Sequence, residues 1–277
     1  MTYVFDVSKQ FAGKTAVVTG GTQGVGEAVA RMFAERGAAA VTICGRNKEN
    51  GKRIACELEG LGTESLFVCA DLGDLADVKS VIPTTLDRFE GVDILINCAA
   101  VTDRGSITTT TPELFEETMN VNLRAPFFLM QDAADSMKKR GTGGSIVSIL
   151  SVNAYGGAPQ LAPYSASKGG LMTLTRNAAN ALSFEQIRVH GIALGWTDTP
   201  NEDRIQKKYH GATELWQEEA VVKLPFGRMV QVGDVARTVG FLCSDESGIA
   251  TGTVFDLNFA VLGTHAPMSE RIADKDD

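Results

Sequence analysis

The sequence predicts an α/β fold, a doubly wound parallel sheet of about seven strands with helices on both faces. First, short apolar runs rich in Val and Ile recur along the chain, and each suits a strand buried on both faces. Second, helical patterns separate these runs, which gives successive right-handed strand–helix–strand units. Third, a glycine-rich turn directly follows the first run. Ligands of such sheets bind beyond the carboxyl ends of the strands.

The individual elements follow from that alternation. Strands are expected at residues 15–19, 40–44, 65–69, 92–97, 145–149 and 187–193, with a last strand within 251–256. Helices are expected at residues 26–36, 50–61, 76–89, 113–140 and 165–182. Residues 1–277 should form one domain with an ordered core over 9–263. The polar residues 200–226 are interpreted as a helical lid over the substrate, or else as a pair of surface helices. The charged residues 264–277 are expected to fray as a tail.

The composition favours a small-molecule ligand and a cytoplasmic protein. A net charge of −8 and a pI near 5.0 argue against a nucleic-acid partner. No apolar stretch reaches the roughly 20 residues of a membrane-spanning helix, and the first residues lack a signal-peptide pattern. The cysteines have no CxxC spacing and are interpreted as reduced core residues; they are Cys44, Cys56, Cys69, Cys98 and Cys243. The three histidines form no metal pattern, and His190 is expected in the core or an interface.

The glycine-rich turn indicates a dinucleotide site. Gly20, Gly24 and Gly26 lie between the first strand and its helix, where a side chain would keep the backbone away from a pyrophosphate. The helix N-terminus supplies amide donors and a favourable dipole for such a group. A glycine-rich turn without a ligand is the alternative. The other expected cofactor contacts in this turn are Thr22, Gln23 and Val25.

A second pattern indicates acid/base chemistry. Tyr164 and Lys168 are four residues apart and therefore share one face of a helix. A phenol is a poor base at neutral pH, but a nearby ammonium favours its phenolate, so Tyr164 could take a proton from an alcohol or return it. A surface Tyr/Lys pair is the alternative. Ser151 strengthens the case, because it ends a buried strand thirteen residues earlier and could hydrogen-bond a substrate oxygen. Ser148, inside the same strand, is interpreted as structural.

The TGxxxGxG turn, the YxxxK pair and the upstream serine together resemble the short-chain dehydrogenase/reductase family over most of the chain. The resemblance implies a single Rossmann-type domain, an NAD(P) cofactor and the interconversion of an alcohol and a carbonyl. It assigns the acid/base role to Tyr164, orientation of the substrate oxygen to Ser151, and tuning and ribose binding to Lys168. Asn122, rather than its neighbour Asn120, matches an Asn that kinks its helix and holds a water in a proton relay.

The resemblance also implies further cofactor contacts. Gly45 stands where NAD-preferring members carry an Asp, and Arg46 follows it, which favours NADP with NAD as the alternative; Arg46 could instead stack on adenine. Asp71, followed by Leu72, matches the residue that binds the adenine amino group; its alternative role is a helix N-cap, which Asp74 could fill instead. The remaining implied contacts are Asn97, Ala99, Thr197 and Thr199.

Candidates for the substrate pocket follow Ser151 and the sixth strand. Asn153, Gln160 and Trp196 suit a polyhydroxylated molecule, so a sugar or polyol is the first choice; a 3-oxoacyl thioester, a steroid or a quinone-like ketone stays open. Tyr155 is the fourth candidate. Arg104 could bind an anionic substrate but is interpreted as a solvated loop residue.

Two other functions remain open at this point. One is epimerisation or dehydration with a retained NAD, and the other is cofactor sensing without turnover. The resemblance further implies a homo-oligomer, a tetramer or a dimer, built on helix faces within residues 113–140 and 165–182.

Overall fold

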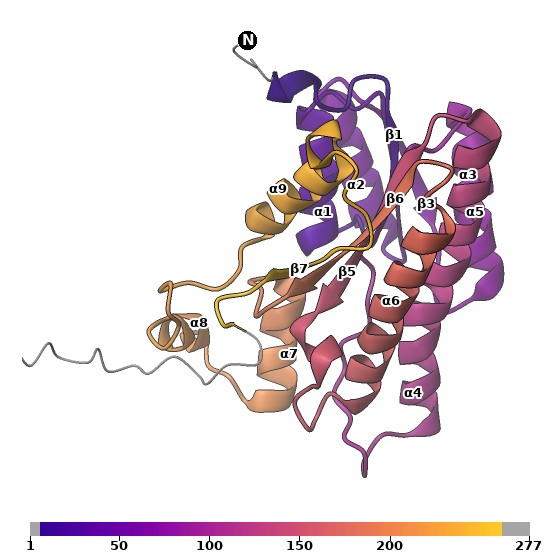
Figure 1. Cartoon of the computed structure of the whole chain (residues 1–277). Helices are drawn as coiled ribbons and strands as arrows, with labels where there is room; N and C mark the ends of the chain where they lie inside the picture. Colours follow the sequence, from indigo (N-terminus) through magenta and orange to yellow (C-terminus); the bar gives the residue numbers. More distant parts are fainter. Residues whose placement is uncertain (1–5, 262–277) are drawn as a thin grey trace, which may run out of the picture.

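The computed structural model describes residues 6–261, and a seven-stranded parallel sheet lies at its centre (Figure 1). The strands stand in the order β3-β2-β1-β4-β5-β6-β7, so the chain starts inside the sheet, builds outward to β3 and returns to the other side of β1. The predicted fold class is confirmed. The strands are β1 (Thr15–Thr19), β2 (Ala40–Gly45), β3 (Glu64–Cys69), β4 (Ile94–Asn97), β5 (Gly144–Ser151), β6 (Ile187–Leu194) and β7 (Val254–Leu257).

Helices connect the strands. They are α1 (Gly24–Glu35), α2 (Lys48–Gly60), α3 (Leu75–Phe89), α4 (Pro112–Met119), α5 (Ala125–Arg140), α6 (Ala162–Ala181), α7 (Pro200–His210), α8 (Trp216–Val221) and α9 (Val232–Cys243). Short 3₁₀ turns are η1 (Val7–Lys9), η3 (Val152–Tyr155) and η4 (Asp245–Ser247), and η2 (Asn120–Arg124) is a π-helix. The sequence prediction lacks α9. Its start nevertheless carries a capping interaction, in which Asp234 accepts a hydrogen bond from the Gln231 amide.

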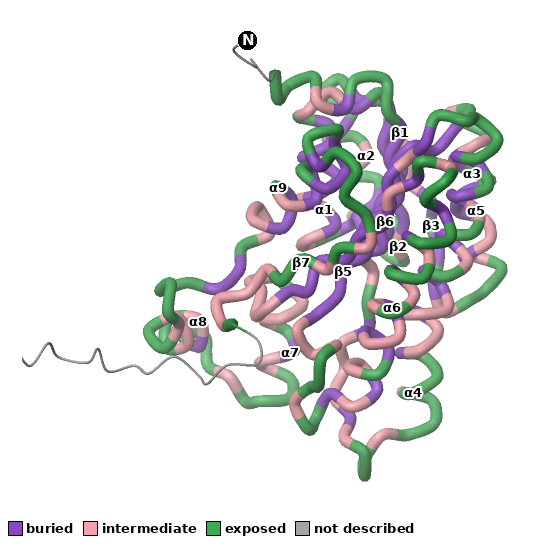
Figure 2. The backbone as a smooth tube through the Cα atoms, in the orientation of Figure 1, coloured by how far each residue is buried: buried purple, intermediate pink, exposed green. Residues whose placement is uncertain are grey.

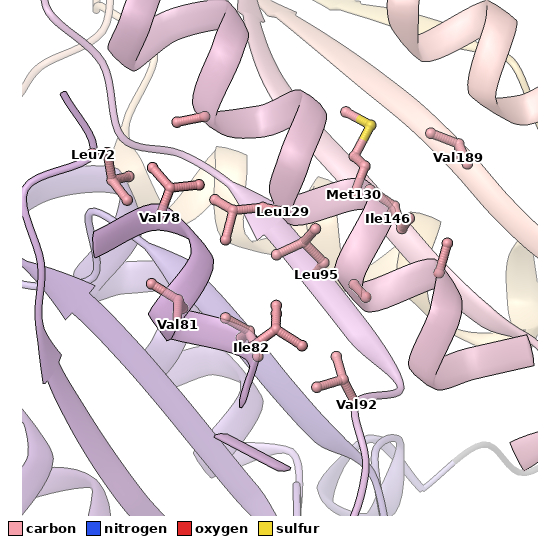
Figure 3. Packing of buried hydrophobic residues seen from close by; sticks show 14 of the residues in the cluster. Leu72, Val78, Val81, Ile82, Val92, Leu95, Leu129, Met130, Ile146 and Val189 are labelled. Atoms are coloured by element: carbon pink, nitrogen blue, oxygen red, sulfur yellow. The ribbon is translucent and has the colours of Figure 1, made fainter. Parts of the chain in front are cut away.

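The central strands are buried because helices cover both faces of the sheet, and the buried stretches of the chain gather along the strands in Figure 2. On one face α3, α5 and α6 pack on the sheet. Figure 3 shows this side, where Val81 and Ile82 of α3 lie near Leu95 of β4 and Leu129 of α5. On the other face α1, α2 and α9 form a second apolar cluster with the strands. This double cover holds the carboxyl ends of the strands in fixed positions.

The long helix predicted over residues 113–140 is continuous but not regular. The π-helix η2 separates α4 from α5, and each π turn holds one residue more than an α turn. An apolar pattern with helical period does not reveal that extra residue. The wider turn lies at the residues where the sequence predicted a helix kink around Asn122.

Other expectations meet mixed outcomes. Residues 200–226 contain two helices, α7 and α8. Cys56 and Cys69 are exposed, so the interpretation of every cysteine as a core residue is wrong for these two, whereas His190 is buried as expected. No helix among residues 6–261 is long and apolar enough to cross a bilayer. Residues 262 and 263 of the expected core, and the tail 264–277, lie outside the described residues.

Candidate active site

A cleft of about 810 Å³ opens at the carboxyl ends of the strands. Its walls come from the segments that follow β1, β2, β3, β4, β5 and β6, and from helix α7. Parallel strands all end at one edge of the sheet, which brings residues from distant parts of the sequence into this one space. The predicted cofactor and catalytic residues can therefore be compared with a single cavity.

The glycine-rich turn forms one end of the cleft. Gly24, the first residue of α1, has a φ of +57°, a conformation that L side chains rarely adopt. A Cβ on Gly26 would lie 2.3 Å from the Gly20 carbonyl oxygen, so the helix can approach the turn this closely only with glycine there. The predicted residues of this turn that line the cleft are Gly20, Thr22, Gln23, Gly24, Val25 and Gly26.

The segments after β2 and β3 continue the same wall. Gly45, Arg46, Asp71 and Leu72 line the cleft. Arg46 is exposed, and its guanidinium makes no hydrogen bond or ion pair within residues 6–261. Asp71 does not cap α3, since Asp74 fills that role by accepting from the first amides of the helix. The Asp71 carboxylate instead accepts from the Gly73 amide at 2.9 Å at the edge of the cleft.

Three of the four predicted catalytic residues meet in the middle of the cleft. Ser151 ends β5, while Tyr164 and Lys168 lie on α6, and all three line the cavity. The Ser151 hydroxyl accepts from Asn153 Nδ2 at 3.2 Å. Burial raises the pKa of Tyr164 to about 12, and the nearby Ser151 hydroxyl acts against this rise. Desolvation is the largest influence on this phenol, which is therefore protonated at neutral pH.

Lys168 is almost fully buried, with 2% of its surface exposed. Its ammonium donates a hydrogen bond of 2.6 Å to the main-chain carbonyl of Ile149. Burial lowers the pKa of Lys168 to about 8, because an ammonium loses its hydration inside the protein. Lys168 therefore carries most of its charge near neutral pH and loses it in mild alkali.

The fourth predicted residue, Asn122, does not line the cleft. Its side chain is fully buried in η2, where Oδ1 accepts from the Val101 amide at 2.8 Å. Its Nδ2 donates to the Val101 carbonyl at 2.9 Å and to Ser167 Oγ at 3.1 Å. These bonds tie the cleft segment at Val101 to helix α6. The Asn122 side chain thus has a structural role in this arrangement, and its predicted part in a water relay stays a prediction.

Two other predicted cofactor contacts, Asn97 and Ala99, lie at the carboxyl end of β4, and only one of them lines the cleft. Ala99 lines the cleft, but Asn97 does not, because its amide points within the sheet and donates to Ser148 Oγ at 3.5 Å. Thr19 was missed by the sequence reasoning. Its Oγ1 accepts from the amides of Cys98 and Ala99 at 2.9 and 3.1 Å and so shapes this cleft segment.

Beyond β6, both predicted threonines line the cleft. Thr199 accepts from the Glu202 amide and caps the start of α7, while Thr197 Oγ1 donates to the Gly195 carbonyl. Trp196, between them, also lines the cleft, and its ring stacks on Trp216 of α8 with 5.6 Å between ring centres. The Trp216 ring thereby supports the Trp196 indole that lines the cleft.

Among the substrate candidates, Asn153 and Gln160 line the cleft, but Tyr155 does not. Tyr155 is 47% exposed, and its hydroxyl donates to Asp256 Oδ1 at 2.9 Å. The prediction for Tyr155 is therefore wrong, because the turn η3 aims its side chain away from the cavity and toward the end of β7.

Arg104 also differs from its prediction. Its side chain lines the cleft and is only 13% exposed, so the solvated interpretation is wrong. Helix α7 adds residues that sequence reasoning did not find, namely Asn201, Glu202, Arg204, Gln206 and His210. The Thr199 cap followed by Pro200 signals where α7 starts, but no local pattern signals which of its faces meets the cavity.

Comparisons with known proteins agree with this site. A family model described as enoyl-(acyl carrier protein) reductase matches residues 20–258. An uncharacterised oxidoreductase of Thermotoga maritima is 39% identical over 88% of this chain and 93% of its own length. An NADP-dependent (R)-specific alcohol dehydrogenase of Lentilactobacillus kefiri is 34% identical over 90% of this chain and 96% of its own.

A solved structure has the same architecture. The crystal structure of a variant of actinorhodin polyketide ketoreductase with NADPH superposes with a TM-score of 0.84 at 27% sequence identity. The match covers 89% of this chain and 96% of the ketoreductase chain. The sequence and the fold of this chain therefore match those of known proteins over nearly the whole described chain.

Proposed function

Because the chain belongs to the short-chain dehydrogenase/reductase family and is thus an NAD(P)-dependent oxidoreductase, we propose that it interconverts a secondary alcohol and a ketone or aldehyde, with Tyr164 as the acid/base. The observation that carries the proposal is the meeting of Ser151, Tyr164 and Lys168 in one buried part of the cleft. The nicotinamide, when bound, supplies the hydride chemistry, and the protein supplies alignment and proton transfer.

The residues of the cleft fit a dinucleotide. In the turn from Gly20 to Gly26, a Cβ on Gly26 would clash with the backbone of Gly20, and the turn leads into the first turn of α1, whose amide donors suit a pyrophosphate. Asp71 would hold the adenine amino group, and Lys168 would hold the ribose next to the nicotinamide. Thr197 and Thr199 would contact the carboxamide and the pyrophosphate.

We propose NADP as the preferred cofactor. Arg46 lines the cleft without an ion-pair partner in the described chain, so its guanidinium is available for the 2′-phosphate. Gly45 precedes it and offers no carboxylate that would repel a phosphate. The named alcohol dehydrogenase relative uses NADP, and the ketoreductase structure contains NADPH, which supports the same choice.

In this proposal each polar group has a separate task. Tyr164 is protonated at neutral pH and donates its proton to the oxygen of a carbonyl that is being reduced. Ser151, which lines the same part of the cleft, orients that oxygen and stabilises the charge that grows on it. Lys168 provides a positive charge close to Tyr164. Asn122 acts as a positioning residue, because it fixes the Val101 segment against α6.

The substrate we propose is a polyhydroxylated alcohol or ketone, such as a sugar or polyol. Gln160 offers an amide group to the cleft, and Trp196 offers an indole face against which carbon–hydrogen surfaces can pack. Asn153 also lines the cleft, where its amide donates to Ser151 Oγ and accepts from the Ala158 amide. Amides both donate and accept, which suits hydroxyl groups better than the long apolar chain of an acyl thioester.

We also propose a homo-oligomer. Phe115 of α4 and Phe127 of α5 each expose 47% of their surface, and apolar side chains of this size favour burial against another subunit.

The direct test follows the reduced-nicotinamide absorbance while the purified protein meets a panel of polyols, sugars and simple ketones. We expect product and cofactor to change in equal amounts. Epimerisation with a retained NAD would give product without net cofactor change, and a sensor would bind the cofactor without turnover. Either result would contradict the proposed reaction.

A further inference from the structure

Two opposite charges stand close together in the cleft without touching. Arg104, in the segment after β4, and Glu202, on α7, are separated by 3.9 Å between Nη2 and Oε1. Their side chains are only 13% and 19% exposed. A hydrogen bond between nitrogen and oxygen needs about 3.2 Å or less, so this pair attracts electrostatically but is not hydrogen-bonded.

Both side chains are held in place by other bonds. Glu202 Oε1 accepts from Trp196 Nε1 at 2.9 Å and from Gln206 Nε2 at 2.7 Å. Arg104 Nη1 donates to the Thr102 carbonyl at 2.9 Å, and Arg104 Nε donates to His210 Nε2 at 3.3 Å. These anchors come from three segments and keep the pair from closing into direct contact.

One atom of each charged group is left for a ligand. Within residues 6–261, Arg104 Nη2 and Glu202 Oε2 make no hydrogen bond, and both residues line the cleft. Nη2 can only donate, and a carboxylate oxygen can only accept. A bridging group must therefore accept from Arg104 and donate to Glu202, and a hydroxyl does both.

We infer that Arg104 and Glu202 form a hydroxyl-binding subsite, which recognises a second hydroxyl group of a neutral, polyhydroxylated substrate. This inference rests on the proposed function and names the residues that give it its selectivity. A carboxylate substrate would be attracted by Arg104 but repelled by Glu202, and an ammonium would meet the opposite conflict. A neutral hydroxyl gains a charge-assisted hydrogen bond from each side.

The subsite lies near the proposed reacting oxygen. After burial and the Ser151 hydroxyl, the charges of Glu202 and Arg104 are the next influences on the pKa of Tyr164, which Glu202 raises and Arg104 lowers. Their effects oppose each other, so the pair as a whole perturbs the pKa of the phenol less than Glu202 would alone. Trp196 connects the two regions, because its ring lines the cleft while its Nε1 holds Glu202.

The test compares matched substrates in matched variants. Wild type, Glu202→Gln and Arg104→Gln are assayed on a vicinal cyclohexanediol and on cyclohexanol, and then on the best polyol of the panel and a deoxy analogue of it. Glu202→Gln keeps an oxygen for Trp196 and removes the charge. The control is Glu214→Gln, a charge loss in the loop between α7 and α8 at a side chain that is 86% exposed.

We expect each variant of the pair to lower kcat/KM for the polyhydroxylated substrate by about tenfold or more, mainly through KM, since each loses a charged hydrogen bond. The ratio to the mono-hydroxy substrate isolates this effect, because a changed Tyr164 pKa or a shifted α7 alters both substrates alike. Cofactor affinity and the Glu214→Gln control should stay at wild-type values.

Three results would overturn the inference. The ratio between substrates could stay unchanged in both variants, which would make the pair merely structural. Hydroxy acids could outperform polyols and improve further in Glu202→Gln, which would make the subsite an anion site. Wild type could prefer mono-hydroxy alcohols, which would leave the proposed reaction standing without this subsite. Absence of turnover on every substrate would instead remove the proposed function itself.

Discussion

The Lys168 ammonium lies 5.8 Å from the centre of the Tyr164 ring, and its hydrogen bond goes to a main-chain carbonyl rather than to the phenol. The lysine therefore influences Tyr164 through space. Maintaining a positive charge at a site this deeply buried is unfavourable for folding, because burial lowers the pKa of Lys168 to about 8. Lys168 therefore lowers the folding stability of the protein while it supplies the charge that the proposed reaction uses.

A first prediction concerns the effect of this buried charge on stability and turnover. Lys168→Met should be more stable than wild type at pH 7 but lose most of its turnover. An unfolded lysine titrates near 10.5 and the folded one near 8, so between these values the unfolded chain binds more protons. Wild-type stability from this group should therefore rise with pH across that window, by up to about 3 kcal/mol.

Urea unfolding of both proteins at pH 7 and pH 10 checks this, with the difference between them cancelling all other groups. If the gap between Lys168→Met and wild type stays constant over that range, the buried-charge explanation is wrong.

A second prediction concerns the pH dependence of the reaction. With a Tyr164 pKa near 12, the base form grows as pH rises, so kcat/KM for alcohol oxidation should increase by up to about tenfold per unit from pH 7 to pH 8, and less steeply above pH 8, where Lys168 loses its charge. Carbonyl reduction needs the protonated phenol, which already dominates at pH 7, and should not gain. Initial rates in both directions across this range decide the matter, and an oxidation rate that is flat with pH would speak against Tyr164 as the base.

A third prediction concerns the cofactor. Arg46→Ala should weaken NADPH binding by about tenfold or more and leave NADH binding nearly unchanged, because only NADPH offers a phosphate to the guanidinium. Gly45→Asp should shift the preference toward NADH. A Cβ at Gly45 lies 3.0 Å from Thr22 Cγ2, so a small adjustment is needed there.

Fluorescence titration of both cofactors measures these affinities, with Arg53→Ala on α2 as a charge-matched control outside the cleft. Equal losses for NADH and NADPH in Arg46→Ala would favour stacking on adenine.

A fourth prediction concerns acid stability. His190 is fully buried in β6, and burial, followed by the charge of Arg188, lowers its pKa to about 4. An unfolded histidine titrates near 6.5, so the unfolded chain binds more protons between these values, and stability should fall as pH drops through that window. The loss from this residue is up to about 3 kcal/mol. His190→Met should lose less stability than wild type between pH 7 and pH 5 in thermal unfolding, and identical pH profiles would rule this cause out.

The sequence predicts the sheet well, for a physical reason. Strands such as β1 and β5 are buried on both faces, so each is a run rich in small and apolar residues that can be recognised locally. The glycine turn and the Tyr164–Lys168 spacing are equally local, because each depends on one turn or one helix face.

Other parts of the site depend on contacts that only the folded chain makes. Arg104 lies in a loop and resembles a solvated residue until α7 packs over it and brings Glu202 within 3.9 Å. Tyr155 follows Ser151 closely, yet the turn η3 directs it toward Asp256. Asn122 lies in the π-helix η2, but the bonds of its amide to Val101 and Ser167 become visible only in three dimensions.

The measurement that tests the central claim most directly is steady-state turnover of Tyr164→Phe with its cofactor affinity determined in parallel. The substitution removes only the hydroxyl, so we expect kcat to fall by about 100-fold or more, as for loss of a general acid/base, while NADPH binds as in wild type. Tyr209→Phe on α7, which removes a hydroxyl that donates to Asp103, serves as the control. A loss of turnover of no more than about twofold in Tyr164→Phe would contradict the mechanism, because the loss of an acid/base causes a far larger decrease.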